Sequence, residues 1–248
     1  MLNSGKMSYM EYYKANNFLE IAKKADKYLK GNSVKKTETT YEFDWFVRYY
    51  EASGNVSDEE VQELWARLLA GEICQNRRYS LKLLDILKNM GKQDAKLFTD
   101  ICAHSFSDGT EWFIPNNDTY LDSHGIFYHD IMLMSELGLM SSNGMIHTCI
   151  NTIEDPSLYC INGDLAMCIS AKGNGGEQYM QFYPFTRAGN ELASLIKIYA
   201  SSEDFVGYAK ILQIEKPECR FHIYKIIEKN GDSLNCDEKD LLSGTEEY

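Results

Sequence analysis

The spacing of the apolar residues changes near Met140, and this change limits the chain to folds that combine helices with a sheet. Before Met140 the apolar side chains recur at steps of three and four residues, as on one face of an α-helix. After it they alternate in short runs separated by Gly, Asn, Asp and Pro, as in β-strands joined by turns. We therefore expect an α+β protein with a helical N-terminal half and a small antiparallel sheet in the C-terminal half.

The first hundred residues predict five amphipathic helices. Ser57 and Glu60 have the spacing of a capping box, in which each side chain accepts a hydrogen bond from the other residue's backbone N–H, so a helix should begin there. Ser80 is placed to cap the following helix. The other helices are expected over 9–29, over 43–50 and from Asp94 to about His104. We assign residues 1–106 to a helical bundle and note that an exposed aromatic face on 43–50 would favour self-association.

Residues 107–227 predict a second unit. A helix over 122–140 should end at Gly138, and short strands are expected between Met145 and Phe185. Thr186 is placed to cap a closing helix that contains Gly189. A helix ending in Leu-Gly-Leu, a hairpin, and Phe-Thr-x-x-Gly-x-Glu-Leu at the start of the next helix together resemble winged-helix domains, in which the Gly allows close packing. Residues from 228 to 248 include seven acidic and two basic side chains, and we expect an acidic tail that frays.

Charge argues against DNA recognition by this winged-helix-like unit. Major-groove reading needs cations that neutralise phosphates, yet the expected reading helix over 123–137 has no Lys or Arg. The whole chain has 25 basic and 37 acidic side chains, a net charge of −12. We therefore expect protein partners or self-association, and keep a nucleic-acid-associated regulator as the alternative. Arg77, Arg78 and Tyr79 form the local basic patch that is the candidate contact for either kind of partner.

Residues 56–73 and 80–90 carry the most specific pattern of the chain. They read Val-Ser-Asp-Glu-Glu-Val-Gln-Glu-Leu-Trp-Ala-Arg-Leu-Leu-Ala-Gly-Glu-Ile and Ser-Leu-Lys-Leu-Leu-Asp-Ile-Leu-Lys-Asn-Met. The pattern resembles a bacterial family known as domain of unknown function 2806, and related wording occurs in abortive-infection alpha-type proteins. The resemblance runs from about residue 44 to residue 195; it implies a setting in bacterial anti-phage defence and implies no catalytic residue or ligand. Its structural signature, with the winged-helix-like positions, is Ser57, Glu60, Trp65, Arg67, Gly71, Glu72, Ser80, Gly138, Thr186 and Gly189.

No motif of the sequence predicts a catalytic, cofactor or metal site. The chain lacks a Gly-x-Ser-x-Gly elbow and a His-Glu-x-x-His pair, and its glycine-rich stretch 172–176 lies between two expected strands without a Gly-Lys-Ser/Thr ending. His124 and His129 are five residues apart, about 140° around a helix, whereas helical zinc ligands lie four apart. We expect no metal and no cofactor, and we keep an uncharacterised enzyme as a further alternative.

The cysteines and the N-terminus predict the compartment. The seven cysteines are odd in number and contain no Cys-x-x-Cys pair, which argues against a disulfide framework and a zinc knuckle. Residues 1–30 mix lysines with acids and offer no uninterrupted apolar stretch for a signal peptide or membrane span. The sequence therefore predicts a non-catalytic cytoplasmic protein-interaction protein with no membrane contact.

Overall fold

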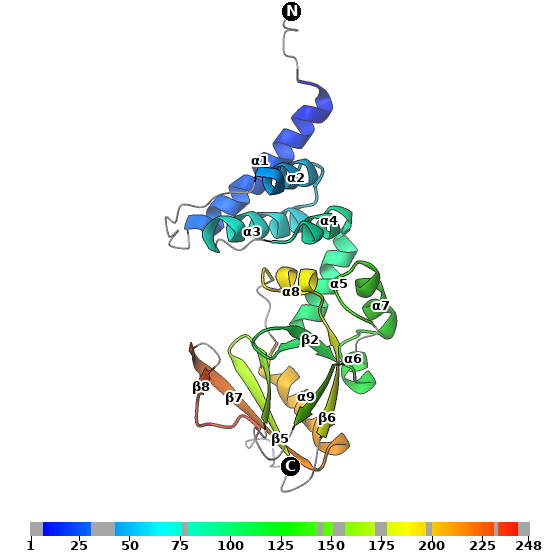
Figure 1. Ribbon diagram of the computed structural model, residues 1–248, viewed down its shortest axis with the longest axis vertical. Helices are drawn as coiled ribbons and strands as arrows, with labels where there is room; N and C mark the ends of the chain where they lie inside the picture. Colours follow the sequence, from blue (N-terminus) through cyan, green and yellow to red (C-terminus); the bar gives the residue numbers. More distant parts are fainter. Residues whose placement is uncertain are drawn as a thin grey trace, which may run out of the picture. The chain divides into compact units, whose positions relative to one another are not determined.

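A computed structural model describes residues 7–30, 43–75, 79–142, 146–150, 157–171, 178–196, 200–230 and 233–242. These residues form helices and an antiparallel sheet (Figure 1), so the predicted mixture of helix and sheet is confirmed. The chain divides into two compact units. Unit 1 is 1–96 with 194–196, and unit 2 is 97–193 with 197–248. The division falls within the helix over Lys92–Ala103, ten residues before the boundary expected from the sequence. No described helix is long and apolar enough to cross a membrane.

The described part of unit 1 is helical. Its core is formed by the inward faces of amphipathic helices, including fully buried Ile21, Tyr49, Trp65 and Leu68. Burial of large aromatic and branched side chains of this kind supplies most of the free energy that holds small helical units together. The helices are α1 (Tyr9–Lys30), α2 (Phe43–Ser53), α3 (Glu59–Gln75) and α4 (Leu81–Asn89), as the sequence predicted to within a few residues at each end.

The start of α3 differs from the predicted capping box. Asp58, not Ser57, caps the helix, because its Oδ1 accepts hydrogen bonds from the backbone N–H groups of Glu60 at 3.0 Å and Val61 at 3.2 Å. The Glu60 carboxylate points instead to Lys92, with Oε1 2.9 Å from Nζ. The predicted Ser80 cap is confirmed, since the Ser80 hydroxyl accepts from the Leu83 N–H.

Unit 2 is built on one antiparallel sheet with the strand order β3-β6-β2-β1-β4-β5-β7-β8 in the described residues. Helix α9 packs against β5 and β7, and α8 packs against β2. The strands are β1 (Phe106–Ser107), β2 (Trp112–Pro115), β3 (Ile146–Ile150), β4 (Ser157–Asn162), β5 (Leu165–Ala171), β6 (Gln178–Pro184), β7 (Cys219–Asn230) and β8 (Ser233–Cys236). The helices are α5 (Lys92–Ala103, which begins in unit 1), α6 (Asp118–Ser123), α7 (Tyr128–Glu136), α8 (Arg187–Ala193) and α9 (Ser202–Glu215).

The helix predicted over 122–140 is two helices. Gly125 has φ +66° and separates α6 from α7, and Gly138 has φ +81° directly after the last residues of α7. Only a glycine adopts this left-handed conformation readily, so both positions end a helix. The sheet is also larger than the small sheet expected, because β1 and β2 pair with β4 and β6 from upstream in the sequence. The winged-helix interpretation stays a prediction.

The segment expected to fray as an acidic tail belongs to β7 and β8 as far as Cys236, and residues 237–242 lie against β7. Ile226 of β7 packs with Ile161 and Ala166, and Leu234 and Cys236 of β8 lie against this cluster. The expectation of a frayed tail was wrong for these residues, because it came from a count of acidic side chains. Such a count ignores that Leu234 and Cys236 are two residues apart and therefore lie on the same face of β8.

Aromatic side chains join α6 and α9 to β1 in the core of unit 2. The Phe106 ring lies 5.0 Å from that of Phe205 and 5.4 Å from that of Tyr208. Tyr120 of α6 is fully buried and lies 4.7 Å from Tyr208. Rings this large and this closely packed hold the two helices in register, so the residues at their ends are placed by the core.

Candidate functional site

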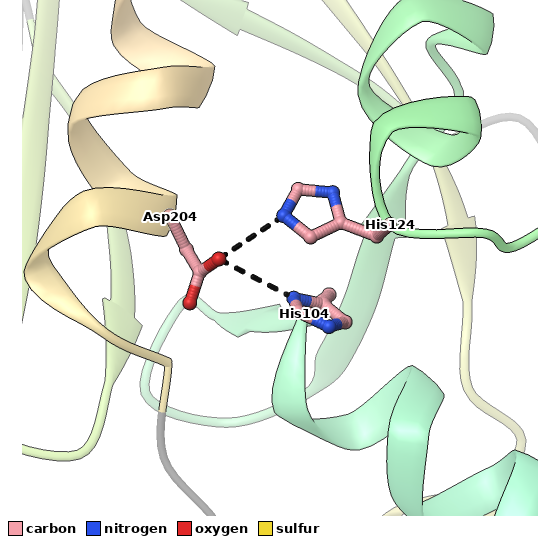
Figure 2. A group of neighbouring side chains, drawn as sticks. All are labelled: His104, His124 and Asp204. Carbon is pink, nitrogen blue, oxygen red and sulfur yellow. Dashed lines mark hydrogen bonds and ion pairs between the residues drawn. The ribbon is translucent and has the colours of Figure 1, made fainter.

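Three side chains converge in unit 2 where the ends of α5 and α6 meet the first turn of α9 (Figure 2). His104 follows α5, His124 is the C-cap of α6, and Asp204 belongs to the first turn of α9. One ring nitrogen of each histidine and one carboxylate oxygen of Asp204 all lie within 4.8 Å of one another. The side chains are 15 to 23% exposed, so the cluster is recessed and still open to solvent.

Asp204 is oriented by the cap of its own helix. Its Oδ2 accepts hydrogen bonds from the Ser201 backbone N–H at 2.8 Å and the Ser201 hydroxyl at 2.7 Å, and the Ser201 hydroxyl accepts from the Asp204 N–H in return. This reciprocal capping box leaves Oδ1 directed at the histidines. Oδ1 lies 3.1 Å from Nε2 of His124 and 3.6 Å from Nδ1 of His104.

Tyr120 contacts the His124 ring and the backbone of His104. The His124 Nδ1 lies 2.7 Å from the Tyr120 carbonyl oxygen. The centroids of the His124 and Tyr120 rings are 4.5 Å apart. The Tyr120 hydroxyl donates to the His104 carbonyl at 2.9 Å. The His104 and His124 rings are 4.0 Å apart, and the buried Nδ1 of His104 has no hydrogen-bond partner among the described residues.

The local electrostatics favour a neutral His104 beside an ionised Asp204. Burial lowers the pKa of His104, and the neighbouring His124 lowers it further, against an opposing effect of Asp204 and Asp100. Burial raises the pKa of Asp204, but the hydrogen bonds from Ser201 and the contacts with the two histidines outweigh it and leave that pKa lowered. The site therefore presents a carboxylate and ring nitrogens that can act as ligands.

Spacing along the chain could not have found this cluster. The spacing of His124 and His129 argues against this pair as joint ligands, and in the structure His129 is exposed and its Nε2 lies 3.1 Å from its neighbour Asp130. His104 and Asp204 reach His124 through the packing of α6 on α9. No local pattern marks ligands that come from three separate elements.

The signature residues of α3 and α4 hold unit 1 together. The Tyr49 hydroxyl donates to the carbonyl of buried Trp65 at 2.7 Å. Arg67 donates from Nη1 to the Leu195 carbonyl at 3.1 Å, which ties the segment 194–196 to α3. Glu72 accepts from the Tyr79 N–H at 3.1 Å. The Tyr79 ring also lies over Gly71, where an added Cβ would meet its hydroxyl at 2.5 Å.

A second group of signature residues closes the sheet of unit 2. The Thr186 hydroxyl donates to the Gly138 carbonyl at 2.6 Å and accepts from the Gly189 N–H at 3.1 Å. The Thr186 N–H donates to the Leu139 carbonyl at 2.9 Å. Thr186 therefore caps α8, as predicted, and links it to the turn after α7.

Helix α2 carries an exposed row of aromatic side chains. We call Phe43, Phe46 and Tyr50 the α2 aromatic face; they are spaced i, i+3 and i+7 and are 75, 40 and 40% exposed. Phe18 of α1 borders this face, with its ring 6.2 Å from that of Phe46 and 4.9 Å from that of Tyr50. Trp45, on the opposite side of α2, is buried.

Comparison with protein families gives a match to the family described as Protein of unknown function (DUF2806) over residues 4–210. The chain belongs to this family. The match is longer than the resemblance over 44–195, and it includes residues of both units. Comparisons with curated proteins and with solved structures find no match.

The predicted contact patch of this DUF2806 member is only partly described. Arg77 and Arg78 lie outside the described residues. Tyr79 is 5% exposed, and the Trp45 indole N–H donates to its carbonyl at 3.0 Å. The Tyr79 side chain is therefore part of the core of unit 1, and contact through the two arginines stays a prediction.

Proposed function

We propose that this DUF2806 protein is a non-catalytic protein-interaction protein that pairs with a second copy of itself through the α2 aromatic face. The exposure of Phe43, Phe46 and Tyr50 on one side of one helix carries the proposal. Single exposed apolar residues are common on proteins, but aromatic residues gathered on one helix face are typical of association surfaces. Burying the three rings against a partner removes them from water and favours the dimer.

The aromatic face supports a second copy as the partner because it can be its own counterpart. In a two-fold antiparallel pair of helices, the same face of each helix meets its counterpart, so an apolar row needs no complementary surface on another protein. The charged side chains of α2 lie away from this face: Asp44, Arg48 and Glu51 line a hollow of about 800 Å³ with Lys14 of α1 and Lys88 of α4. Successive residues of a helix are about 100° apart, so Arg48 lies on the far side of α2 from the three rings and stays in solvent in the pair.

The mass of the full chain in solution tests the proposal. We expect a concentration-dependent dimer by sedimentation velocity, and we expect the double variant Phe43→Ser with Phe46→Ser to be a monomer. Tyr128→Ser is the matched control, because Tyr128 of α7 is 56% exposed but lies in unit 2. A wild-type chain that is monomeric at its highest soluble concentration, or a double variant that still dimerises like the wild type, would contradict the proposal.

A charge reversal on the far side of α2 tests which face pairs. Arg48→Glu should leave the dimer as in the wild type, because Arg48 lies away from the three rings. Sedimentation velocity of this variant beside the Phe43→Ser, Phe46→Ser variant measures the difference. A dimer lost in Arg48→Glu as fully as in the double variant would exclude this arrangement of the helices.

We propose bacterial anti-phage defence, in the cytoplasm, as the setting of this interaction, on the resemblance of α3 and α4 to abortive-infection alpha-type proteins. Expression of the wild-type chain should lower phage plating, and the Phe43→Ser, Phe46→Ser variant should not. Equal phage plating with and without the wild-type chain would contradict the defence role and would leave the proposed dimer unaffected. We do not adopt the nucleic-acid alternative, because α7 contains no Lys or Arg to neutralise phosphates.

A further inference from the structure

We infer that His104, His124 and Asp204 bind a divalent transition-metal ion of the zinc class. The ligand atoms are Nδ1 of His104, Nε2 of His124 and Oδ1 of Asp204 (Figure 2). Two imidazole nitrogens and one carboxylate oxygen are a donor set that suits zinc and its neighbours better than calcium or magnesium, which prefer oxygen ligands. The site is separate from the α2 aromatic face and does not depend on the proposed dimer.

The distances between the donor atoms fit a shared ion. In a tetrahedral zinc site with bonds of about 2.0–2.1 Å, two ligand atoms lie about 3.3 Å apart. The separations from Oδ1 of Asp204 to Nε2 of His124, 3.1 Å, and to Nδ1 of His104, 3.6 Å, lie on either side of that value. Small side-chain adjustments would bring all three atoms to one ion.

The hydrogen bond of His124 directs a lone pair at the carboxylate. A carbonyl oxygen only accepts, and the Ser123 hydroxyl, 3.0 Å from Nδ1, donates its own proton to the same Tyr120 carbonyl, so the short contact between Nδ1 and that carbonyl places a ring proton on Nδ1. In the tautomer whose single proton is on Nδ1, Nε2 has a lone pair that faces Oδ1 of Asp204, and two acceptors at 3.1 Å repel each other unless a positive charge lies between them. A metal ion supplies that charge, and a ring N–H donated to a backbone carbonyl is the usual outer-shell support of a metal-binding histidine.

His104 and Asp204 complete the argument. A buried ring nitrogen without a partner is unfavourable, and Nδ1 of His104 has none among the described residues, so coordination would satisfy it. Asp204 has one oxygen held by Ser201 and one directed at the histidines, which fits a carboxylate that binds through a single atom. Three protein ligands in a partly exposed site leave a fourth position for water or another ligand.

Metal titration of the full chain tests the inference. After treatment with a chelator, we expect calorimetry to show one Zn²⁺ bound per chain, and Co²⁺ to give the intense visible bands of a four-coordinate ion. His104→Gln and His124→Gln should each weaken Zn²⁺ binding by about tenfold or more, because each removes a ligand. The thermal midpoint of the wild type should rise with Zn²⁺, and that of the double variant should not.

His222→Gln is the matched control. His222 also pairs with a carboxylate, with Nδ1 2.8 Å from Oδ2 of Asp240, but this pair has no third ligand side chain among the described residues. Its Zn²⁺ affinity should equal that of the wild type. Circular dichroism of the metal-free variants checks that they fold, and the Co²⁺ spectrum of the wild type tests the site without any variant. A wild type that binds neither ion, or that binds Zn²⁺ no more tightly than the double variant, would show that a proton joins His124 to Asp204 and would overturn the inference.

Discussion

Two glycines in helices of unit 2 have opposite surroundings. A Cβ added to Gly189 of α8 would lie 1.9 Å from the Leu139 carbonyl oxygen and 3.0 Å from its carbon, so the backbone itself blocks any side chain there. A Cβ added to Gly207 of α9 would meet nothing within 4 Å. Gly189 is required for the close approach of α8 to the turn after α7, whereas Gly207 only weakens its helix.

The substitutions Gly189→Ala and Gly207→Ala should therefore change stability in opposite directions. Gly189→Ala should lower the free energy of unfolding by about 3 kcal/mol, because the backbone must move to relieve the contact. Gly207→Ala should raise it by about 0.5 to 1 kcal/mol, because alanine restricts the unfolded chain and favours the helix. Urea denaturation followed by circular dichroism measures both. Equal stability of Gly189→Ala and the wild type would contradict the close contact.

At the scale of the element, the start of α3 shows how a charged cap depends on pH. The backbone N–H of Val61 is the main cause of the lowered pKa of Asp58; burial opposes it, and the N–H of Glu60 and the Lys92 ammonium add to the lowering. A carboxylate whose pKa is lower in the folded chain stabilises that chain above its unfolded pKa of about 3.9. The stabilisation is lost as the pH falls through the folded value.

Comparison of the wild type with Asp58→Asn isolates this effect, since asparagine keeps a capping oxygen but does not titrate. The wild type should have the higher urea midpoint at neutral pH, and the difference should shrink as the pH falls below about 4. Ser57→Ala is the control, because Ser57 does not cap α3, and its difference from the wild type should not vary over this pH range. A constant difference between Asp58→Asn and the wild type would exclude the ionised cap.

At the scale of the whole molecule, the C-terminal segment is part of the fold of unit 2. The Leu241 N–H donates to the Ile223 carbonyl at 2.8 Å, and Asp240 accepts from the Ile223 N–H at 3.0 Å. Leu242 is 6% exposed. These contacts join residues 237–242 to β7, so the acidic side chains around them lie on the surface of a folded segment.

Leu242→Ser should therefore destabilise the protein by about 2 kcal/mol, because it places a hydroxyl in an apolar position and leaves a cavity. Ile214→Ser is the control within the same unit. Ile214 is 83% exposed, and its replacement should change the free energy of unfolding by less than about 0.5 kcal/mol. Thermal or urea unfolding measures both variants. A loss no larger for Leu242→Ser than for Ile214→Ser would mean that the segment does not contribute to stability.

Features that depend on neighbours within a few residues could be predicted from the sequence. The positions of α1, α2 and α4, the Ser80 cap and the Thr186 cap all follow from helical spacing and from hydrogen bonds that span three or four residues. The capping box at Ser57 was wrong by one residue, because Ser57 and Asp58 are both good capping residues and spacing does not choose between them.

The sequence by itself determined that the chain forms amphipathic helices followed by antiparallel strands, because the spacing of its apolar residues is a local property. Tertiary structure alone decided that residues 194–196 join unit 1, that the C-terminal strands complete the sheet, and that His104 and His124 meet Asp204. These partners are separated by tens of residues, and only the packing of apolar faces and the pairing of strands bring them together.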